Sequence, residues 1–219
     1  MDKAFWHERW QRGEIGFHQQ RIHALLLRYW PKLGLPREGA VFVPLAGKSR
    51  DMGWLATQGH RVIGVELSDV AVREFFDEGG LMPARSLAGA FEIFSAEPFE
   101  LYCGDFFELT AGVLKNVVAV YDRAALIALP PEMRARYAEA LARILPRETI
   151  IFLIAIDYPE GEITGPPFSV SPDEVRRLYG DAFEIEVLES RDGLADSDNL
   201  KKRGVTRLEE TAYLLRRRS

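Results

Sequence analysis

The chain has 219 residues, 47% of them hydrophobic and 11% aromatic, which is typical of a globular protein, and we expect a single domain over residues 1–219. A net charge of −5 gives no basic excess for nucleic acid or a membrane surface, and one cysteine excludes an internal disulfide and a cysteine-rich zinc site. No apolar run reaches membrane-spanning length, charges interrupt the N-terminus, and the four histidines are scattered. We therefore expect a soluble cytoplasmic protein without a metal site, and a monomer, since no spare apolar strand or heptad repeat is visible.

Helical and strand-like segments alternate along the chain, which favours an α/β fold with a mostly parallel sheet and helices on both faces. The predicted helices cover residues 1–12, 18–33, about 70–77 and 131–144, with another between the first two strands and one starting after Ser171. The predicted strands cover about 40–44, 61–66, 91–94, 99–103, 116–121, 149–156, 183–189 and 209–216. No helix-length apolar pattern separates the last two strands, which could pair antiparallel at one sheet edge.

Two helices carry more detailed expectations. In the segment 131–144, an apolar face is formed by Met133, Tyr137, Leu141 and Ile144. The helix after residue 171 begins with Ser-Pro-Asp-Glu, where Ser171 is expected to cap the helix and Glu174 to complete a capping box.

The most informative segment is 41–68, which holds a strand, a loop with Gly47, a helix, a second strand and the acid Glu66. This order is how α/β folds hold the adenosine part of a cofactor, with the acid on the ribose hydroxyls. The acid follows the glycine by 19 positions (66 − 47), close to the expected ~20. An ordinary strand-helix-strand unit with a surface acid is the alternative.

Two phosphate-binding signatures fail in this segment. Gly47-Lys48-Ser49 looks like the end of a P-loop, but position 42, where that motif needs a glycine, is Phe42. The GxGxxG fingerprint that lets backbone approach a pyrophosphate is also absent. The segment therefore favours a nucleoside cofactor attached without phosphate, and S-adenosylmethionine fits that description.

Five motifs in order along the chain make the sequence resemble the thiopurine S-methyltransferase family of class I methyltransferases. They are FWHERWQRGEIGFHQ (5–19), VFVPLAGKSRDMGWLATQGHRVIGVELS (41–68), YCGDFFEL (102–109), YDRAALIALP (121–130) and GPPFSV (165–170). The resemblance implies methyl transfer from S-adenosylmethionine to an aromatic or heterocyclic thiol, or to selenium or tellurium species. It also implies a class I sheet, mostly parallel, and an N-terminal lid over about residues 1–20.

The resemblance also implies which residues hold the cofactor. Trp6 and Trp10 share a helix face and would belong to the lid over the cofactor, although two tryptophans docked on the core are the alternative. Leu45 would meet the ligand through its backbone. Asp105 and Phe106 lie where such folds meet adenine, but Gly104-Asp105 also suits a turn or a helix cap.

On the acceptor side, the resemblance assigns Phe17 to stacking on a planar substrate and Arg123 to the methyl-acceptor end and the cofactor. Asp122 is a candidate catalytic residue that more plausibly orients Arg123 or caps the next helix than acts as a base. The loop at Pro166 and Pro167 would close over the substrate, with an ordinary crossover loop as the alternative. Which basic residue among 201–203 reaches the substrate stays open.

Two other functions remain open from the residues. The first is an NAD-dependent oxidoreductase, against which the missing GxGxxG weighs. The second is a non-catalytic module that binds S-adenosylmethionine.

Overall fold

The computed structural model describes residues 3–16, 18–37 and 39–218. The chain divides into two compact units, Met1–Ala119 and Val120–Ser219. The expectation that all 219 residues form one domain stays a prediction.

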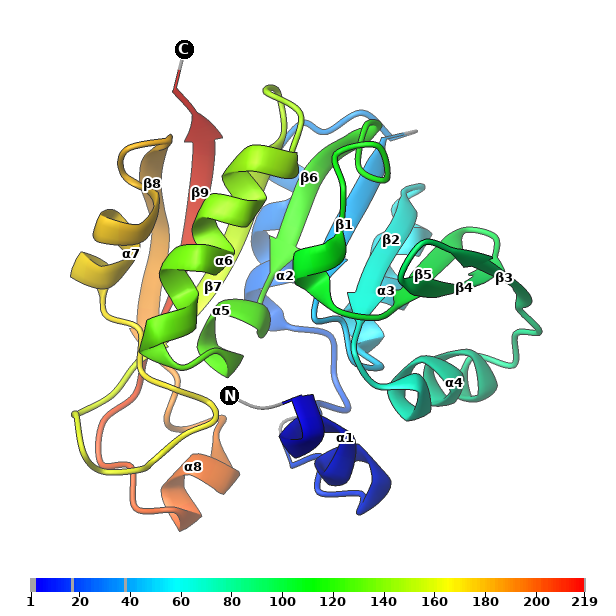
Figure 1. Cartoon of the computed structure of the whole chain (residues 1–219). Helices are drawn as coiled ribbons and strands as arrows, with labels where there is room; N and C mark the ends of the chain where they lie inside the picture. The colour runs from blue at the N-terminus through cyan, green and yellow to red at the C-terminus, as the bar shows by residue number, and fades with distance from the viewer. Residues whose placement is uncertain (1–2, 17, 38, 219) are drawn as a thin grey trace. The chain divides into compact units, whose positions relative to one another are not determined.

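The first unit contains five strands with helices between them (Figure 1). Its elements are α1 (Lys3–Gln11), α2 (Ala24–Tyr29), η1 (Trp30–Lys32), β1 (Ala40–Pro44), α3 (Arg50–Thr57), β2 (Arg61–Glu66), α4 (Asp69–Glu78), β3 (Ala84–Ala88), β4 (Phe91–Ala96), β5 (Phe99–Cys103) and η2 (Phe106–Glu108). The strands lie in the order β3-β4-β5-β2-β1. The pairs β1–β2 and β2–β5 are parallel, while β4 pairs antiparallel with both β5 and β3. The carboxyl ends of β1, β2 and β5 therefore meet at one edge.

Local sequence explains why the helices after β1 and β2 begin where they do. Ser49 caps α3, its side chain accepting the Asp51 N–H, and Ser68 caps α4, accepting the Ala71 N–H. All five residues of β1 are buried, as are all residues of β2 except Arg61. Strands buried on both faces suit a parallel sheet covered by helices.

Two expectations in the first unit need correction. The helix predicted over 18–33 starts at Ala24, because the His23 ring accepts the Leu25 N–H while the His23 backbone N–H donates to Asp51 Oδ1 at 2.9 Å. Strand β3 was not predicted, since all of its residues are exposed and give no alternating apolar pattern.

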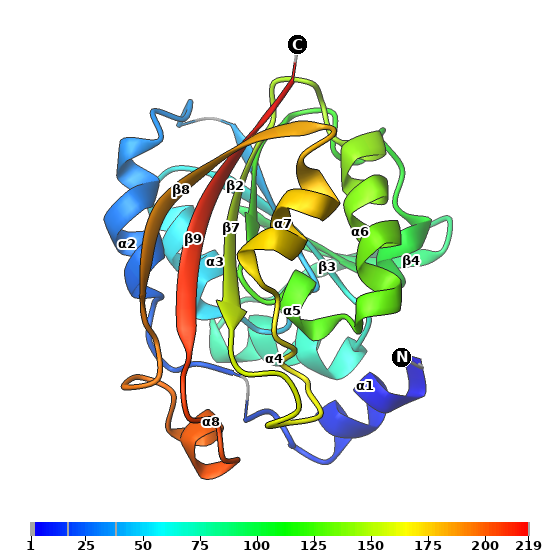
Figure 2. The same cartoon turned by 90° about the vertical axis from the view of Figure 1, so that its left-hand side faces the viewer.

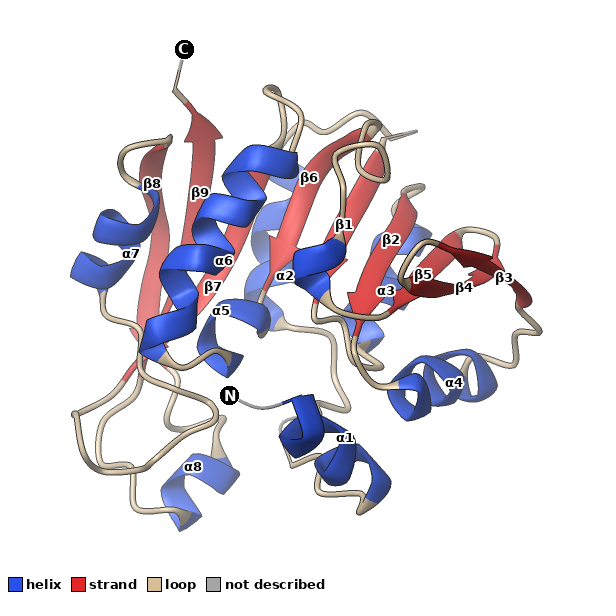
Figure 3. Ribbon diagram, in the orientation of Figure 1, coloured by secondary structure: helices blue, strands red, loops and turns tan. Residues whose placement is uncertain are grey.

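The second unit consists of three antiparallel strands and the helices around them. Strand β6 (Val117–Asp122) crosses the boundary between the units, and then follow α5 (Ala125–Ala128), α6 (Pro131–Ile144), β7 (Ile150–Asp157), α7 (Pro172–Tyr179), β8 (Phe183–Asp192), α8 (Asp198–Lys202) and β9 (Glu209–Arg217). Strand β9 pairs antiparallel with β7 and β8 (Figure 3). Helices α6 and α7 lie together on one face of these strands (Figure 2). The α/β class with an antiparallel C-terminal pair is thus confirmed.

Three details of the second unit differ from expectation. Helix α8 was not predicted, because five residues are too short to show a periodic pattern. On α6, Met133 is only partly buried, whereas the charged Arg134 is 1% exposed. The serine half of the predicted capping box is confirmed, but both carboxylate oxygens of Glu174 bind Arg134 and Arg177.

Candidate functional site

The loop after β1 has an unusual backbone at the position predicted to face a ligand. Leu45 has φ of +47°, in the left-handed region that costs a residue with a side chain about 1–2 kcal/mol. Gly47 follows with φ of +53°. Between them, Ala46 donates its N–H to Val65 O at 2.9 Å, which ties the loop to the end of β2. Strain of this kind clusters at ligand sites, where the surrounding structure maintains it.

Glu66 ends β2, is 7% exposed, and is oriented by the loop backbone. Its Oε2 accepts the Gly47 N–H at 2.8 Å and its Oε1 accepts the Ser68 N–H at 2.9 Å. Burial raises the pKa of Glu66, and the N–H groups of Ser68, Gly47 and Leu67 oppose that rise by stabilising the anion. Each carboxylate oxygen keeps lone-pair capacity, so the group can accept two neighbouring hydroxyls such as those of a ribose.

Helix α1 lies against this loop within the first unit. Trp10 is 4% exposed, and a Cβ added at Gly47 would stand 3.3 Å from Trp10 Cζ2. Trp6, one turn earlier, is partly buried and makes an edge-to-face contact with Phe5. Trp10 thus packs close to the loop after β1, and the role of Trp6 and Trp10 in a lid over the cofactor stays a prediction.

Asp105 and Phe106 follow β5, and both side chains already have protein partners. Asp105 Oδ1 accepts the Phe107 N–H at 3.0 Å, which caps η2, and Oδ2 forms an ion pair with Lys3 of α1 at 2.8 Å. Phe106 is 6% exposed and stacks on Phe42, with ring centroids 6.4 Å apart. Both side chains are thus engaged within the first unit, and their assignment to adenine stays a prediction. Phe17 lies outside the described residues.

Lys48 also belongs to the loop after β1. The sequence alone assigns it no role beyond the incomplete P-loop motif. Its side chain is 9% exposed, and Nζ lies 2.7 Å from Glu74 and 2.6 Å from Glu78, which are one turn apart on α4. Burial lowers the pKa of Lys48, but the two carboxylates outweigh it and the pKa is raised. The loop is therefore tied to α4 as well as to β2. The signal in the sequence was the i, i+4 glutamate pair.

In the second unit, the structure separates the roles of Asp122 and Arg123. Asp122 is 1% exposed, its Oδ2 accepts the Tyr137 hydroxyl at 2.7 Å, and its Oδ1 accepts the Leu126 N–H at 3.3 Å. Burial raises the pKa of Asp122 to about 6, although these donors lower it. Asp122 thus holds the start of α5. Within the described part of the second unit, no group forms a hydrogen bond or ion pair with the partly exposed Arg123.

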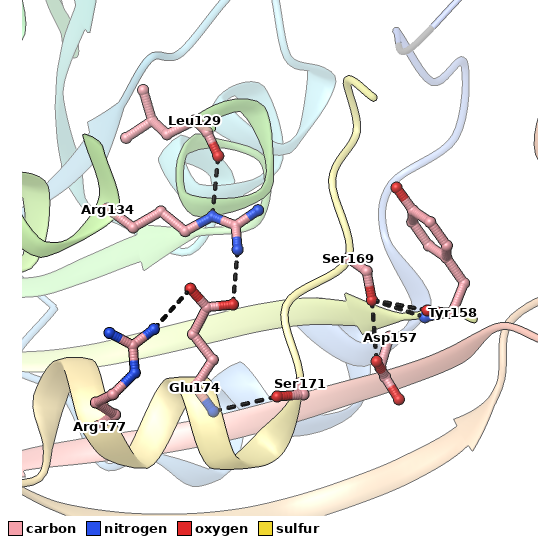
Figure 4. A network of polar contacts seen from close by, with 8 residues as sticks. All are labelled: Leu129, Arg134, Asp157, Tyr158, Ser169, Ser171, Glu174 and Arg177. Carbon is pink, nitrogen blue, oxygen red and sulfur yellow. Dashed lines mark hydrogen bonds and ion pairs between the residues drawn. The ribbon is translucent and has the colours of Figure 1, made fainter. Parts of the chain in front are cut away.

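The loop of residues 158–170, which we call the proline loop, is closed at its base by side-chain contacts (Figure 4). Tyr158 donates its N–H to Ser169 Oγ at 3.0 Å, and that hydroxyl donates to Asp157 Oδ1 at 2.9 Å. Phe168 donates its N–H to Ile127 O at 2.7 Å. The last contact joins the proline loop to α5, the helix that follows Arg123.

Below the proline loop, Arg134 makes a buried ion pair. Its Nη1 lies 2.6 Å from Glu174 Oε2 and its Nε donates to Leu129 O at 2.9 Å (Figure 4). The guanidinium carbon lies 5.8 Å from the Phe168 ring centroid. Phe168 of the proline loop therefore contacts Arg134, whose positive charge is paired with Glu174 of the same unit.

The described residues contain no cluster of three or more His, Cys, Asp or Glu side chains able to hold a metal ion. Among the described helices, none has the length and apolar character needed to cross a membrane.

The chain is similar to known proteins in sequence and in fold. The family model described as "Thiopurine S-methyltransferase (TPMT)" matches residues 1–218. A thiopurine S-methyltransferase of Xanthomonas axonopodis pv. citri is 50% identical over 218 residues, covering 100% of both chains. One of Pseudomonas fluorescens is 49% identical over 216 residues, covering 99% of both.

Solved structures agree with the fold at low sequence identity. A 1,6-didemethyltoxoflavin-N1-methyltransferase of Burkholderia thailandensis, solved with S-adenosylhomocysteine, has a TM-score of 0.66 and 15% identity, covering 99% of this chain and 87% of its own. A SAM-dependent methyltransferase of Anabaena variabilis has a TM-score of 0.63 and 14% identity, covering 99% and 95%. These matches to methyltransferases contradict the alternative of an NAD-dependent oxidoreductase. The chain belongs to the thiopurine S-methyltransferase family and is a methyltransferase enzyme that uses S-adenosylmethionine.

Proposed function

We propose that this enzyme methylates the sulfur of aromatic or heterocyclic thiols such as thiopurines, by in-line displacement, and that selenium and tellurium species are further acceptors. The relatives that share about half of its residues over their whole length are named for the thiopurine reaction. We also propose that it acts as a cytoplasmic monomer on small molecules alone.

The observation that carries the cofactor half of this proposal is the fixed carboxylate of Glu66. Backbone N–H groups from Gly47 and Ser68 hold its two oxygens, so its remaining lone pairs have set directions before any ligand arrives. Such a group suits a vicinal diol and repels phosphate. The residues present thus fit S-adenosylmethionine, whose sulfonium supplies an activated methyl carbon when bound.

The other residues of the first unit would complete the cofactor site. The Leu45 backbone turns the loop toward the ligand, and Trp6 and Trp10 supply aromatic faces that favour a nearby cation. The backbone at Asp105 would bind adenine, and the Phe106 ring would contribute apolar surface beneath it. Together these groups would exclude water from the donor, which strengthens electrostatic interactions at the site.

On the acceptor side, we assign Arg123 to the thiol. A guanidinium beside a thiol favours its thiolate form, which is the nucleophile. Phe17 would stack on the planar acceptor, and Pro166 and Pro167 would cover it. Asp122 would hold Arg123 in place through its bonds to α5, since its buried carboxylate has Tyr137 and backbone donors as partners. Aligning the thiol with the methyl carbon in this way can lower the free-energy barrier to methyl transfer by about 7–11 kcal/mol.

A methyl-transfer assay over a panel of acceptors tests this proposal. Purified enzyme with S-adenosylmethionine would be given a thiopurine, a simple aromatic thiol, an alkyl thiol, selenite and tellurite, and methylated products measured by mass spectrometry. We expect the heteroaromatic thiols to have the highest kcat/KM, and the Arg123→Met variant to lose most of that rate. Tight binding of S-adenosylhomocysteine without product from any thiol would refute the proposed acceptor class.

A further inference from the structure

The carbonyls of Pro166 and Pro167 in the proline loop are held by two side chains of the second unit, one from the start of the loop itself and one from the residue after α8. Arg203 Nη1 donates to Pro166 O at 2.9 Å, and the Tyr158 hydroxyl donates to Pro167 O at 2.8 Å. A proline has no backbone N–H, so its carbonyl is its only backbone hydrogen-bonding group. The single backbone carbonyl of each of these two prolines therefore accepts a hydrogen bond from a side chain.

Both donors are themselves fixed. Tyr158 is 4% exposed and belongs to an apolar cluster with Leu200, Val205 and Leu208. Arg203 is the C-cap directly after α8, where its backbone N–H bonds to Asn199 O at 3.2 Å and to Leu200 O at 3.1 Å. The residues that follow α8 thus pack on the base of the proline loop.

A further pair of hydrogen bonds joins the residues after α8 to the proline loop. The Glu162 carboxylate accepts the Thr206 N–H at 3.0 Å and also the Thr206 hydroxyl. The stretch 203–206 therefore binds the proline loop near its start and again at Pro166. Neighbouring Lys201 does not take part, because its Nζ bonds to Ala195 O at 2.9 Å and pairs with Asp198 at 3.6 Å.

We infer that Arg203 and Tyr158 are positioning residues for the methyl acceptor, acting by holding the Pro166 and Pro167 carbonyls and so fixing the proline faces that cover the thiol. This rests on the proposed function, in which those prolines line the acceptor site. Among the basic residues at 201–203, Arg203 is thus the one that acts on the acceptor side, and it acts through Pro166.

Three variants separate this role from a general effect of charge. Arg203→Met removes the donor and keeps the aliphatic stem, and Tyr158→Phe removes the hydroxyl without changing charge. Lys201→Met is the matched control, since it removes a cation two residues before Arg203 whose bonds to Ala195 O and Asp198 do not reach the proline loop. Melting temperatures would confirm that all three fold.

We expect Tyr158→Phe to raise the KM for a heteroaromatic thiol about fivefold and Arg203→Met about tenfold, from the loss of one hydrogen bond each. The kcat at saturating thiol and the affinity for S-adenosylhomocysteine should stay within about twofold of wild type, since the lost interaction acts on acceptor binding. Lys201→Met should leave all three quantities unchanged.

Amide hydrogen exchange supplies a readout that needs no turnover. Residues 160–165 and 168–170 should exchange faster in Arg203→Met than in Lys201→Met, because a released loop opens more readily. Equal exchange rates and equal thiol KM in these two variants would overturn the inference. So would a fall in the kcat of Arg203→Met with an unchanged thiol KM, if Tyr158→Phe has wild-type kinetics. A wild-type enzyme that methylates no thiol refutes the proposed function instead, and the exchange comparison then decides the loop-holding role by itself.

Discussion

Replacing Glu66 by glutamine tests the cofactor site with the smallest change in shape. At present each carboxylate oxygen accepts one backbone N–H, from Gly47 at 2.8 Å and from Ser68 at 2.9 Å. An amide offers one oxygen and one NH2 group. Whichever way it turns, NH2 faces a buried N–H donor, and one of the two hydroxyl-accepting positions is lost.

The size of the effect follows from these contacts. A hydrogen bond to a charged group contributes about 1.5–3 kcal/mol, so Glu66→Gln should weaken binding of S-adenosylhomocysteine about 10- to 150-fold. Glu66→Ala should weaken it by about 1.5–3 kcal/mol as well, since it removes the same charged acceptor. The buried donor left unpaired in the glutamine variant should also lower its melting temperature.

Isothermal titration calorimetry with S-adenosylhomocysteine measures this directly, without any acceptor present. Glu97→Gln is the control, because the Glu97 side chain is 81% exposed in the same unit. Wild-type affinity in Glu66→Gln, with the fold intact, would remove Glu66 from the cofactor site and the reasoning about its oriented lone pairs with it.

Three further predictions concern other residues. Arg123→Ala should lower turnover more than cofactor affinity, and steady-state kinetics with calorimetry would contradict this if affinity collapsed while kcat survived. Lys48→Met should lower the melting temperature, by leaving Glu74 and Glu78 facing each other, and lose that deficit in the Lys48→Met/Glu78→Gln double variant. Burial raises the pKa of Asp122 from 3.8 to about 6, so the protonated carboxyl stabilises the folded state below pH 4. This contribution to the free energy of unfolding, about 3 kcal/mol at most, should be lost as pH rises through 6. In denaturant titrations, the free energy of unfolding of Asp122→Asn should therefore depend less on pH over this range than that of the wild type.

The sequence predicted best where local pattern and local structure coincide. The strands at 40–44 and 61–66 are apolar runs, the first followed by the loop with Gly47 and the second ending at Glu66, and their parallel pairing agrees with the predicted order. The Ser171 cap was readable because capping is decided within four residues. Fold class and cofactor therefore came from short-range signals combined with five motifs.

What the sequence missed depends on distant partners. Arg134 was not expected in the core, because its burial is made tolerable by Glu174, 40 residues away. The bond from Arg203 to Pro166 spans 37 residues, and neither end shows a local signal. Helix α8 is stabilised by packing of Leu200 on Tyr158 and Leu208 rather than by its own periodicity.

The left-handed backbone at Leu45 costs stability at a position that we propose meets the cofactor. Asparagine adopts that conformation more readily than leucine, so a search for thermostable variants would select substitutions there. The present residue keeps its turn because the Ala46–Val65 bond and the Gly47–Glu66 bond on either side enforce it. Stabilising designs for this enzyme should therefore leave residue 45 unchanged and look to exposed positions such as Met82 and Leu87, which are 95% and 84% exposed.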